Sequence, residues 1–293
     1  MDTPDTTAQR HVIDCRGLKL PSRRTPLIMG IVNITPDSFS DGGRFLEYDR
    51  AIEHAVMLAA AGADIVNIGG ESTRPGSDPV STEQEIARVQ PVLEVLVAEL
   101  PVPVSIDTRK AAVADAALSA GCHLVNDVSA CRDESMPEVL CKHDAPVVIM
   151  HMRGDPKTMQ ERPHYHDVTE EVGRFLQDRA GYLVERGVSS ERIIIDPGIG
   201  FGKRFRDNLE LINRIGEIRS LGFPVLVGAS RKRFLGELTD EGVEGRLAGS
   251  LAVAAKCYES GVDIVRVHDV KETRQLFTVL DALDNPGEYS ADW

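Results

Sequence analysis

The sequence predicts a single (β/α)8 TIM barrel whose floor is covered by an N-terminal β-hairpin. Eight short apolar runs alternate with longer amphipathic segments, and nearly every run ends in a polar side chain. A doubly wound open sheet also alternates strands and helices, but eight repeats favour the closed barrel. We expect residues 1–293 to form one domain, with a core over about 27–283 and flexible tails at 1–10 and 284–293.

The eight apolar runs are the expected barrel strands. Each is short, rich in Val and Ile and almost free of polar interruptions, as strands buried on both faces are. In chain order they read LIMGIVNI (27–34), DIVNIGG (64–70), VPVSID (102–107), HLVND (123–127), PVVIMH (146–151), RIIID (192–196), PVLVG (224–228) and DIVRVH (263–268). Before them, HVIDCRGLKL (11–20) contains two strand-like pieces around an Arg-Gly turn, which predicts the hairpin.

The segments between the runs predict helices. Residues 82–100 place apolar side chains at helical spacing. Within them, Thr82 and Glu85 are spaced as a capping box, and Pro91 should kink or locally break the helix. Two later helices are expected to start at aspartate caps, Asp207 and Asp269. Left-handed C-terminal caps are expected at Gly62, Gly121, Gly187, Gly222 and Gly261.

The composition limits the classes of function. The chain has 33 Lys and Arg against 46 Asp and Glu, and its net charge of −13 argues against a nucleic-acid-binding protein. No apolar run approaches the ~20 residues of a membrane helix, and the first residues lack the apolar core of a signal peptide. The five cysteines contain no C-x-x-C pair, so we expect reduced thiols in a cytoplasmic protein.

Polar side chains at the carboxyl ends of barrel strands converge on one rim, where barrel enzymes hold their active sites. The strand ends of this sequence carry Asn33, Glu71, Asp107, Asn126 with Asp127, His151, Asp196, Ser230 and His268. Any one of the acidic or amide residues is equally well explained as a helix N-cap. Because most of the eight strand ends carry such a group, a shared site is the better interpretation.

Two of these residues, Asp107 and Asp196, are expected to be buried carboxylates, which are costly unless hydrogen-bond donors reach them. A 2-amino-4-oxo-pyrimidine edge presents adjacent N–H groups in bidentate geometry, and Asn126 would add contacts to the same ring. The stretch DPGIGFGK (196–203) has the spacing of neither a P-loop nor a dinucleotide-binding loop. Its flexible backbone permits close approach to a flat ligand, on which Phe201 would pack.

Two loops and a basic cluster complete the predicted site. TPDSFSDGG (35–43) and STRPGSDP (72–79) are expected to be lids over the barrel mouth, with ordinary solvated turns as the alternative. The cluster SRKR (230–233) follows the seventh strand, and Arg266 and His268 end the eighth. Because the loops after these two strands are a frequent phosphate site in barrels, this pairing indicates a phosphorylated substrate. The two arginines of the cluster are also explained as solvated surface charges.

From about Ile28 to Thr273, the chain resembles the dihydropteroate synthase family. The matching motifs are MGIVNITPDSFSDGG, GADIVNIGGESTRPG, VPVSIDT, LVNDV, MHMRGDPKTMQ, DPGIGFGK, VGASRKRF and IVRVHDVKET. The resemblance implies a transferase, often a homodimer, that joins 6-hydroxymethyl-7,8-dihydropterin pyrophosphate to p-aminobenzoate in folate biosynthesis. It implies small-molecule substrates, with no nucleic acid and no membrane. Two alternatives stay open: a pterin-binding methyltransferase-type barrel and a non-catalytic pterin-binding relative.

The resemblance also implies a role for each matching residue. The pterin pocket would comprise Asp107, Asn126, Asp196 and Lys232. The pyrophosphate site would comprise Asn33, Arg266 and His268, with Asn33 as a ligand of magnesium (Mg2+). The p-aminobenzoate pocket would comprise Phe39, Thr73, Arg74, Pro75, Phe201 and Ser230. The catalytic groups would be Asp41, Lys232, Arg266 and His268.

One position departs from the pattern of the family. Ile199 stands in DPGIGFGK where several relatives carry an aromatic residue, and this affects the expected packing near Phe201. The same stretch has no insertion of the kind associated with sulfonamide resistance. We therefore expect sulfonamides to compete with p-aminobenzoate.

Overall fold

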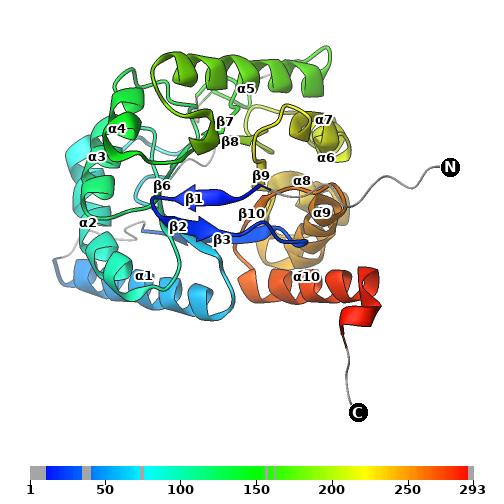
Figure 1. Ribbon diagram of the computed structural model, residues 1–293, viewed down its shortest axis with the longest axis horizontal. Helices are drawn as coiled ribbons and strands as arrows, with labels where there is room; N and C mark the ends of the chain where they lie inside the picture. Colours follow the sequence, from blue (N-terminus) through cyan, green and yellow to red (C-terminus); the bar gives the residue numbers. More distant parts are fainter. Residues whose placement is uncertain (1–10, 35–40, 73–75, 156–157, 162, 290–293) are drawn as a thin grey trace.

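The strands follow one another in chain order around a ring of parallel strands (Figure 1). The structure is a computed structural model that describes residues 11–34, 41–72, 76–155, 158–161 and 163–289. The strands are β3 (Leu27–Asn33), β4 (Ile65–Gly69), β5 (Val104–Asp107), β6 (Leu124–Asp127), β7 (Val147–Met150), β8 (Ile193–Asp196), β9 (Leu226–Val227) and β10 (Ile264–Val267). Their hydrogen-bonded order is β8-β7-β6-β5-β4-β3-β10-β9, and a bridge between Ile195 and Val225 joins the two ends. The predicted (β/α)8 barrel and its eight strands are confirmed.

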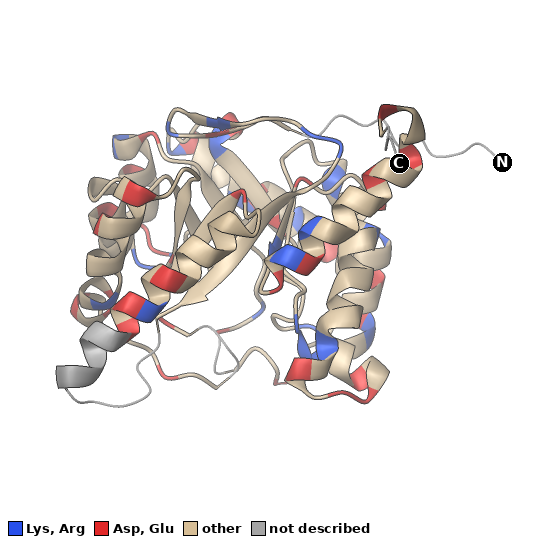
Figure 2. Ribbon diagram, turned by 90° about the horizontal axis from the view of Figure 1, so that it is seen from below, with Lys and Arg blue, Asp and Glu red and all other residues tan. Residues whose placement is uncertain are grey.

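Helices surround the ring of strands on the outside (Figure 1). They are α1 (Asp41–Ala60), α2 (Thr82–Glu99), α3 (Ala111–Ser119), α4 (Met136–His143), α5 (Val168–Glu185), α6 (Phe205–Asn213), α7 (Ile215–Arg219), α8 (Arg233–Thr239), α9 (Leu247–Glu259) and α10 (Val270–Asp284). Short 3-10 turns lie at Ser190–Arg192, Val243–Arg246 and Pro286–Glu288. Figure 2 shows that charged residues lie mainly on the helices and loops, while the barrel strands are mostly uncharged.

The start of α2 differs from the predicted capping box. Its N-cap is Ser81 instead of Thr82, and the Ser81 hydroxyl accepts the backbone N–H of Gln84 at 3.2 Å. The Glu85 side chain does not reach back to the helix start, because it is buried in an ion pair with Lys110. The expected capping box is therefore wrong, although the helix begins where it was expected.

Pro91 lies inside α2, which continues past it, so the expected break is wrong and the expected kink stays a prediction. Proline has no N–H to donate to the carbonyl four residues earlier, which here belongs to Ala87. The hydroxyl of Tyr48 on α1 donates to that carbonyl at 2.9 Å. The carbonyl oxygen orphaned by the proline thus has a partner on the neighbouring helix.

The two aspartates expected as N-caps differ in position. Asp207 is the third residue of α6, where its carboxylate accepts the backbone N–H of Arg204 at 2.8 Å. Asp269 occupies the N-cap position of α10, but its carboxylate binds the Arg231 guanidinium at 2.5 Å. The glycine caps are confirmed, because all five expected glycines have positive φ, from 72° to 103°.

The N-terminal hairpin closes one end of the barrel, as predicted. β1 (Ile13–Cys15) and β2 (Leu18–Leu20) pair antiparallel around Arg16 and Gly17, which have φ of 54° and 95°. The hairpin forms one buried cluster, the floor cluster, with inward side chains of the strands. Its members are Ile13, Cys15, Leu20, Leu27, Met29, Ile65, Leu124, Val148, Ile194, Leu226 and Ile264.

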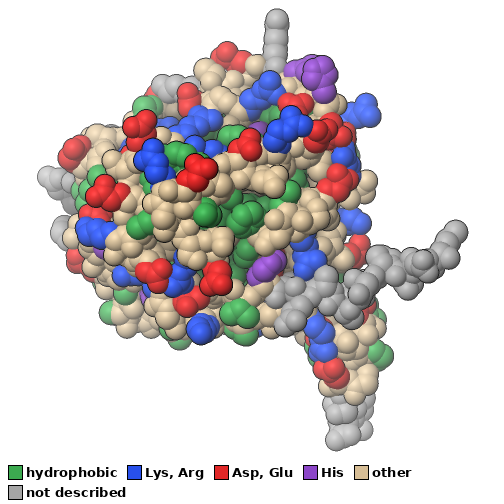
Figure 3. All heavy atoms as spheres, turned by 45° about the horizontal axis from the view of Figure 1, so that its top comes forward, with side chains coloured by type: hydrophobic (Ala, Val, Ile, Leu, Met, Phe, Trp, Pro, Cys, Tyr) green, Lys and Arg blue, Asp and Glu red, His purple; other side chains and the backbone are tan. Residues whose placement is uncertain are grey.

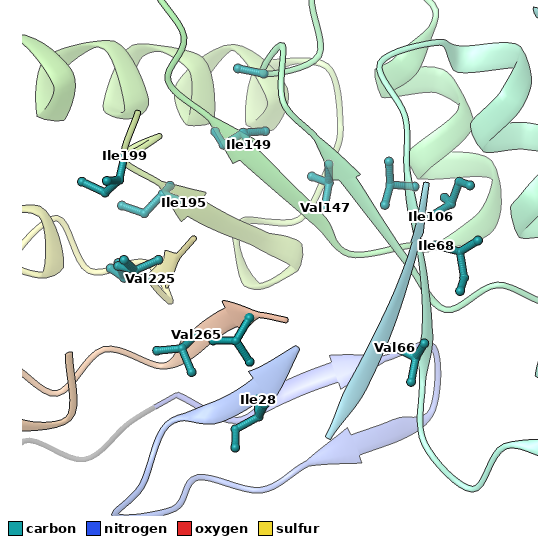
Figure 4. Close-up of a cluster of buried hydrophobic side chains, with 14 of the residues drawn as sticks. Ile28, Val66, Ile68, Ile106, Val147, Ile149, Ile195, Ile199, Val225 and Val265 are labelled. Carbon is teal, nitrogen blue, oxygen red and sulfur yellow. The ribbon is translucent and has the colours of Figure 1, made fainter. Parts of the chain in front are cut away.

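The alternate side chains along each strand point outward into the larger core between the barrel and the helices (Figure 4). Ile28, Val66, Ile106, Ile149 and Val265 are examples, and each alternates with an inward residue. This alternation helps to place the site, because inward side chains at the carboxyl ends of the strands lie near the rim of the barrel.

On the surface, basic and acidic side chains are interspersed, with apolar side chains exposed between them (Figure 3). Among the described residues, no helix is both long enough and apolar enough to span a membrane. None of the five cysteines is in a disulfide, and Cys141 alone among them is exposed.

Candidate active site

Four of the predicted site residues lie in one layer inside the barrel, near its carboxyl-terminal rim. Side chains alternate along a strand, so the residue two positions after a floor residue also faces inward. At this spacing the floor residues of β6, β8 and β10 are followed by Asn126, Asp196 and Arg266. Asp107, on β5, is paired in register with Asn126. The structure thus brings the predicted pterin residues together with the predicted pyrophosphate arginine.

Asp107 is buried and paired within the protein. Its Oδ2 accepts a hydrogen bond from Arg266 Nη2 at 2.5 Å and another from Asn67 Nδ2 at 3.0 Å. Its Oδ1 has no hydrogen-bond partner among the described residues. One oxygen of the carboxylate is therefore held by two side chains of the barrel, and the other is buried without a donor among the described residues.

Asp196 is the second buried carboxylate of the site. Its Oδ1 accepts the backbone N–H of Gly198 at 2.7 Å. Burial raises the pKa of Asp196 to about 6, against the opposing effect of the Gly198 N–H and of the positive charges of Lys232 and Lys203. Gly198 has a φ of +68°, and a Cβ there would overlap the carbonyl oxygen of His151. Only glycine therefore permits this tight turn after β8.

Lys232 and Phe201 connect the loops that follow β9 and β8. The Lys232 Nζ lies 4.0 Å from the centroid of the Phe201 ring, a cation–π contact, and its stem passes beside Gly200. Phe201 is buried at the rim beside Met150 and Met152. The residue expected to bind pterin and the residue expected in the p-aminobenzoate pocket therefore share one wall of the site.

The three basic side chains of the cluster SRKR (230–233) have different partners and do not all reach the site. Arg231 is paired with Asp269, and Arg233 is 87% exposed and paired with Glu237. The alternative of a solvated surface charge is therefore correct for Arg233, whereas Arg231 lies in a partly buried ion pair. Lys232 alone among the three basic residues contacts the described part of the site.

Ser230 and His268 contact each other at the ends of β9 and β10. The Ser230 hydroxyl lies 3.0 Å from Nδ1 of His268 and accepts the His268 backbone N–H at 3.2 Å. The sequence placed Ser230 in the p-aminobenzoate pocket and His268 in the pyrophosphate site. In the structure these two residues, expected in different subsites, form one hydrogen-bonded pair.

Asn33 ends β3 with an exposed side chain beside this layer. A Cβ placed on Gly69 would lie 3.5 Å from both Asn33 Oδ1 and the Asp107 side chain, so the two residues flank the same space. In the part of the chain that the structure describes, no cluster of three His, Cys, Asp or Glu could hold a metal ion. The donor set is thus one amide oxygen, which suits Mg2+ bound largely through substrate phosphates and water. The magnesium site stays a prediction.

The two expected lids lie mostly outside the described residues. Phe39, Thr73, Arg74 and Pro75 fall there, and their roles stay predictions. Asp41 begins α1, and its catalytic role also stays a prediction. The second loop is anchored at the end of β4, where Glu71 accepts hydrogen bonds from Arg109 at 2.8 Å and from Lys110. Glu71 is therefore an anchor of the loop instead of a group that lines the site.

Two other strand-end residues also bind loop residues, Asp127 in the loop after β6 and His151 in the loop after β8. Asp127 is fully buried, and its carboxylate accepts N–H groups of Ser129 and Cys131 at 2.6 and 3.0 Å. Burial raises the pKa of Asp127 to about 6. His151 is buried against Lys203, with its Nδ1 2.8 Å from the Lys203 Nζ. Burial and the Lys203 charge lower the pKa of His151 to about 2, so the ring is neutral and is no general base near pH 7.

Sequence reasoning missed Lys203, a buried cation at the end of the glycine-rich stretch. Besides His151, its Nζ donates to the carbonyl oxygens of Phe201 at 3.1 Å and His151 at 3.3 Å. Burial lowers the pKa of Lys203 to about 7. The Tyr165 hydroxyl donates to the Gly202 carbonyl at 2.7 Å. These contacts hold the loop that carries Phe201 against the end of β7.

Asn67 was also missed, because it lies inside an apolar run instead of at a strand end.

Ile199 was expected to affect the packing near Phe201. It is fully buried in the outer core with Ile195 and Val225, whereas Phe201 belongs to a separate cluster at the rim (Figure 4). Ile199 therefore packs on the barrel instead of on the site.

The fold and the site define a (β/α)8-barrel enzyme with buried carboxylates and cations gathered at its carboxyl-terminal rim. Residues 29–268 match the family model described as pterin binding enzyme. A dihydropteroate synthase of Bacillus subtilis is 43% identical over 283 residues, which are 96% of this chain and 97% of that protein. The chain therefore belongs to the dihydropteroate synthase family of pterin-binding enzymes.

Solved structures agree with this assignment. A Xanthomonas albilineans dihydropteroate synthase with 4-aminobenzoic acid has a TM-score of 0.87 at 44% identity, covering 94% of this chain and 98% of that one. A Yersinia pestis dihydropteroate synthase with a sulfonamide drug complex has a TM-score of 0.88 at 40% identity, covering 94% of this chain and 100% of that one. The chain is thus similar to these enzymes over nearly its full length.

Proposed function

We propose that this enzyme transfers the pterin methylene group of 6-hydroxymethyl-7,8-dihydropterin pyrophosphate to the amine of p-aminobenzoate, forming 7,8-dihydropteroate and pyrophosphate. The observation that carries the proposal is the pair of buried carboxylates, Asp107 and Asp196, beside Arg266 in one layer of the rim. A pterin ring has adjacent N–H groups that satisfy buried carboxylates, and a pyrophosphate group requires cations.

Pterin recognition is assigned to the inward residues of the barrel. Asp196 would accept the ring N–H groups as a carboxylate, with Asn126 and the free Oδ1 of Asp107 completing the contacts. Lys232 would lie over the same region from the β9 side, where it already contacts Phe201. This set of acceptors and donors discriminates a pterin from a purely apolar ring, since unmatched buried polar groups are costly.

Departure of pyrophosphate is assigned to the β3 and β10 ends of the rim. The C–O bond between the pterin methylene and pyrophosphate breaks, and the electron pair leaves with pyrophosphate. Arg266 and His268 would stabilise that negative charge, and the carboxylates would stabilise the positive pterin that remains. Asn33 would hold Mg2+, which when bound supplies further charge stabilisation for the leaving group.

The amine of p-aminobenzoate then forms the new C–N bond with its lone pair and loses a proton to solvent or to the departing pyrophosphate. Ser230 and Phe201 would contact p-aminobenzoate, together with Phe39, Thr73, Arg74 and Pro75 from the two loops. Asp41 would assist stabilisation of the cationic pterin. Closure of the loops would exclude water, which otherwise captures the cation.

The deciding experiment is pyrophosphate release from the dihydropterin pyrophosphate, measured with magnesium in the presence and absence of p-aminobenzoate. Release that requires p-aminobenzoate and yields dihydropteroate supports the proposal. Tight pterin binding without release contradicts it and favours a non-catalytic relative. Pterin binding together with methyl transfer from a reduced folate favours a methyltransferase-type barrel. A chelator control, restored by added Mg2+, tests the cofactor separately.

The proposal includes a homodimer and a cytoplasmic location. The net charge of −13 and the free cysteines support a soluble protein in a reducing compartment. Light scattering coupled to size-exclusion chromatography measures the oligomeric state, and a monomer at micromolar concentration contradicts the dimer. Cell fractionation tests the location, and recovery in the membrane fraction contradicts it.

A further inference from the structure

Asn67 is a buried amide in the middle of β4, inside the barrel. It is 0% exposed, and its neighbours in register are Ile31 and Ser105. An amide buried without hydrogen bonds is destabilising, so its contacts are informative. Its Nδ2 donates to Asp107 Oδ2 at 3.0 Å, while its Oδ1 has no hydrogen-bond partner among the described residues. Asn67 therefore lies directly beneath a residue of the proposed pterin site.

The Asn67 contact controls how the Asp107 carboxylate is turned. Asp107 Oδ2 receives both Asn67 Nδ2 and Arg266 Nη2, and Oδ1 is left without a protein donor in the described part of the chain. Of the two donors, Arg266 ends in a flexible guanidinium on β10 that is also assigned to pyrophosphate. Asn67 is enclosed on β4 and has no exposed surface. Asn67 is thus the donor to Asp107 that has no other assigned partner among the described residues.

We propose that Asn67 is a positioning residue for pterin recognition: its amide N–H holds Asp107 Oδ2, so that Oδ1 faces the ring N–H groups of the bound substrate. This inference rests on the proposed function. We therefore expect Asn67 to affect the binding of the pterin pyrophosphate and not the binding of p-aminobenzoate, because its side chain contacts only the carboxylate of the proposed pterin site.

An amide serves this role at every pH, because it does not titrate and always offers its N–H. A carboxyl at position 67 would donate to Asp107 only while protonated. Once ionised, it would face Asp107 at hydrogen-bond distance, where two negative charges repel. The other charged groups near Asp107 are Arg266 on β10 and Asp127 on β6, whose pKa Asp107 helps to raise. Asp196 lies across the same layer from them.

The experiment compares Asn67→Ala and Asn67→Asp with the wild-type enzyme and with Ser105→Ala as the matched control. Ser105 lies beside Asn67 in register, is equally buried, and its hydroxyl has no hydrogen-bond partner among the described residues. Steady-state kinetics give KM for each substrate, and calorimetry gives the affinity for 6-hydroxymethylpterin. Thermal melting monitors the fold.

Asn67→Ala is expected to raise KM for the pterin pyrophosphate and weaken 6-hydroxymethylpterin binding by about tenfold, the size of one lost hydrogen bond to a charged group. KM for p-aminobenzoate is expected to stay within about twofold, and Ser105→Ala to change neither KM. For Asn67→Asp, the ratio of its pterin KM to that of the wild type is expected to rise with pH. That direction follows because the carboxyl loses the proton that it must donate.

The inference is overturned if folded Asn67→Ala keeps the wild-type pterin affinity, or if it raises both KM values equally. It is also overturned if the pterin KM of Asn67→Asp follows the wild-type pH profile. If Asn67→Ala does not fold, Asn67→Asp carries the test alone. Failure of the proposed function is distinguishable, because the wild-type enzyme would then release no pyrophosphate in the presence of p-aminobenzoate.

Discussion

The Ser230 hydroxyl lies 3.0 Å from Nδ1 of His268 and also accepts the backbone N–H of His268. Because that backbone N–H already donates to the oxygen, the hydroxyl hydrogen is available to Nδ1 of the neutral imidazole. In the tautomer that accepts this hydrogen bond, the ring proton is on Nε2, which points a donor away from the serine. Ser230 therefore connects the proposed p-aminobenzoate pocket to the proposed pyrophosphate site.

Ser230→Ala is expected to slow pyrophosphate release by about tenfold as well as raise KM for p-aminobenzoate, because His268 loses the partner that orients its ring. Single-turnover release separates the two effects. Ser220→Ala, which removes an exposed hydroxyl bonded to the Glu217 carbonyl, serves as the control. An unchanged release rate at saturating p-aminobenzoate would show that Ser230 does not act through His268.

Asp196→Asn is expected to weaken pterin pyrophosphate binding by at least tenfold, because the amide cannot accept two ring N–H groups. Burial raises the pKa of Asp196 to about 6, so wild-type affinity should fall as the pH drops through 6 and the carboxyl becomes protonated. Asp196→Asn should lack that component. Calorimetry between pH 5 and pH 8 measures both effects, and unchanged affinity would defeat the assignment.

The folding stability of Asp196→Asn checks that its lower affinity comes from lost binding contacts and not from a destabilised fold. A carboxyl whose pKa is raised by folding contributes stability at low pH that is lost as the pH rises through about 6. Asp196→Asn removes the ionised form, and its amide oxygen still accepts the Gly198 N–H. At pH 8 the variant should therefore melt at or above the temperature of the wild type.

Arg266→Ala is expected to lower kcat by about a hundredfold, the size of the loss of one preorganised donor to a developing negative charge. The affinity for 6-hydroxymethylpterin, which lacks the pyrophosphate, should fall by a smaller factor than kcat, because Asn67 still donates to Asp107. Turnover and calorimetry are measured on the same preparation. A normal rate would remove Arg266 from the pyrophosphate site.

Lys203→Met is expected to change how stability depends on pH. The pKa of Lys203 is lowered by burial to about 7, whereas an unfolded lysine titrates near 10.4. Between these values the folded state binds fewer protons, so this group adds stability as the pH rises above 7 and loses it as the pH falls through 7. The stability difference between the wild type and Lys203→Met should rise by up to ~1.4 kcal/mol per pH unit over this interval.

Denaturant unfolding from pH 6 to pH 10 measures that difference. The matched control is Lys271→Met, because Lys271 is exposed on α10. Its stability difference from the wild type should stay flat over the same interval. A flat difference for Lys203→Met as well would mean that burial does not lower the pKa of Lys203 in the folded protein.

Sulfonamides are expected to compete with p-aminobenzoate, because an aryl sulfonamide has the size and the amine of that substrate. The Yersinia pestis relative has been solved with a sulfonamide drug complex, and DPGIGFGK carries no insertion here. Excess p-aminobenzoate should restore full turnover, whereas excess pterin pyrophosphate should not. Inhibition that p-aminobenzoate fails to reverse would place the drug elsewhere.

Most of the barrel could be predicted because its strands are strongly patterned. All eight apolar runs became strands, and the glycines that follow the helices adopt the left-handed conformation expected of them. The errors concern local hydrogen bonds. Ser81 took the cap expected of Thr82, and a tyrosine hydroxyl from α1 satisfied the carbonyl that Pro91 leaves free. Such choices depend on neighbours that are distant in sequence.

The site, like the fold, was predicted correctly in part. Asp107, Asn126, Asp196 and Arg266 could be placed at one rim from their positions in the strands, because parallel strands end on the same side of a barrel. Glu71, Asp127 and His151 had the same signal, yet each binds a loop residue. Asp127 binds the loop that follows it, Glu71 binds Arg109 after β5, and His151 contacts Lys203 after β8. A strand-end position brings a side chain to the rim, but its partners decide whether it faces the cavity.

The pattern of apolar runs, glycines and terminal polar residues was enough for the barrel, its hairpin floor and the motifs of the family, since these depend on local periodicity and chain order. The pairing of Asp107 with Asn67 and Arg266, the contact of Lys232 with Phe201 and the burial of Lys203 required the folded chain. These contacts join different strands and the loops that follow them. Their geometry and electrostatics arise only when the ring closes and removes the groups from water.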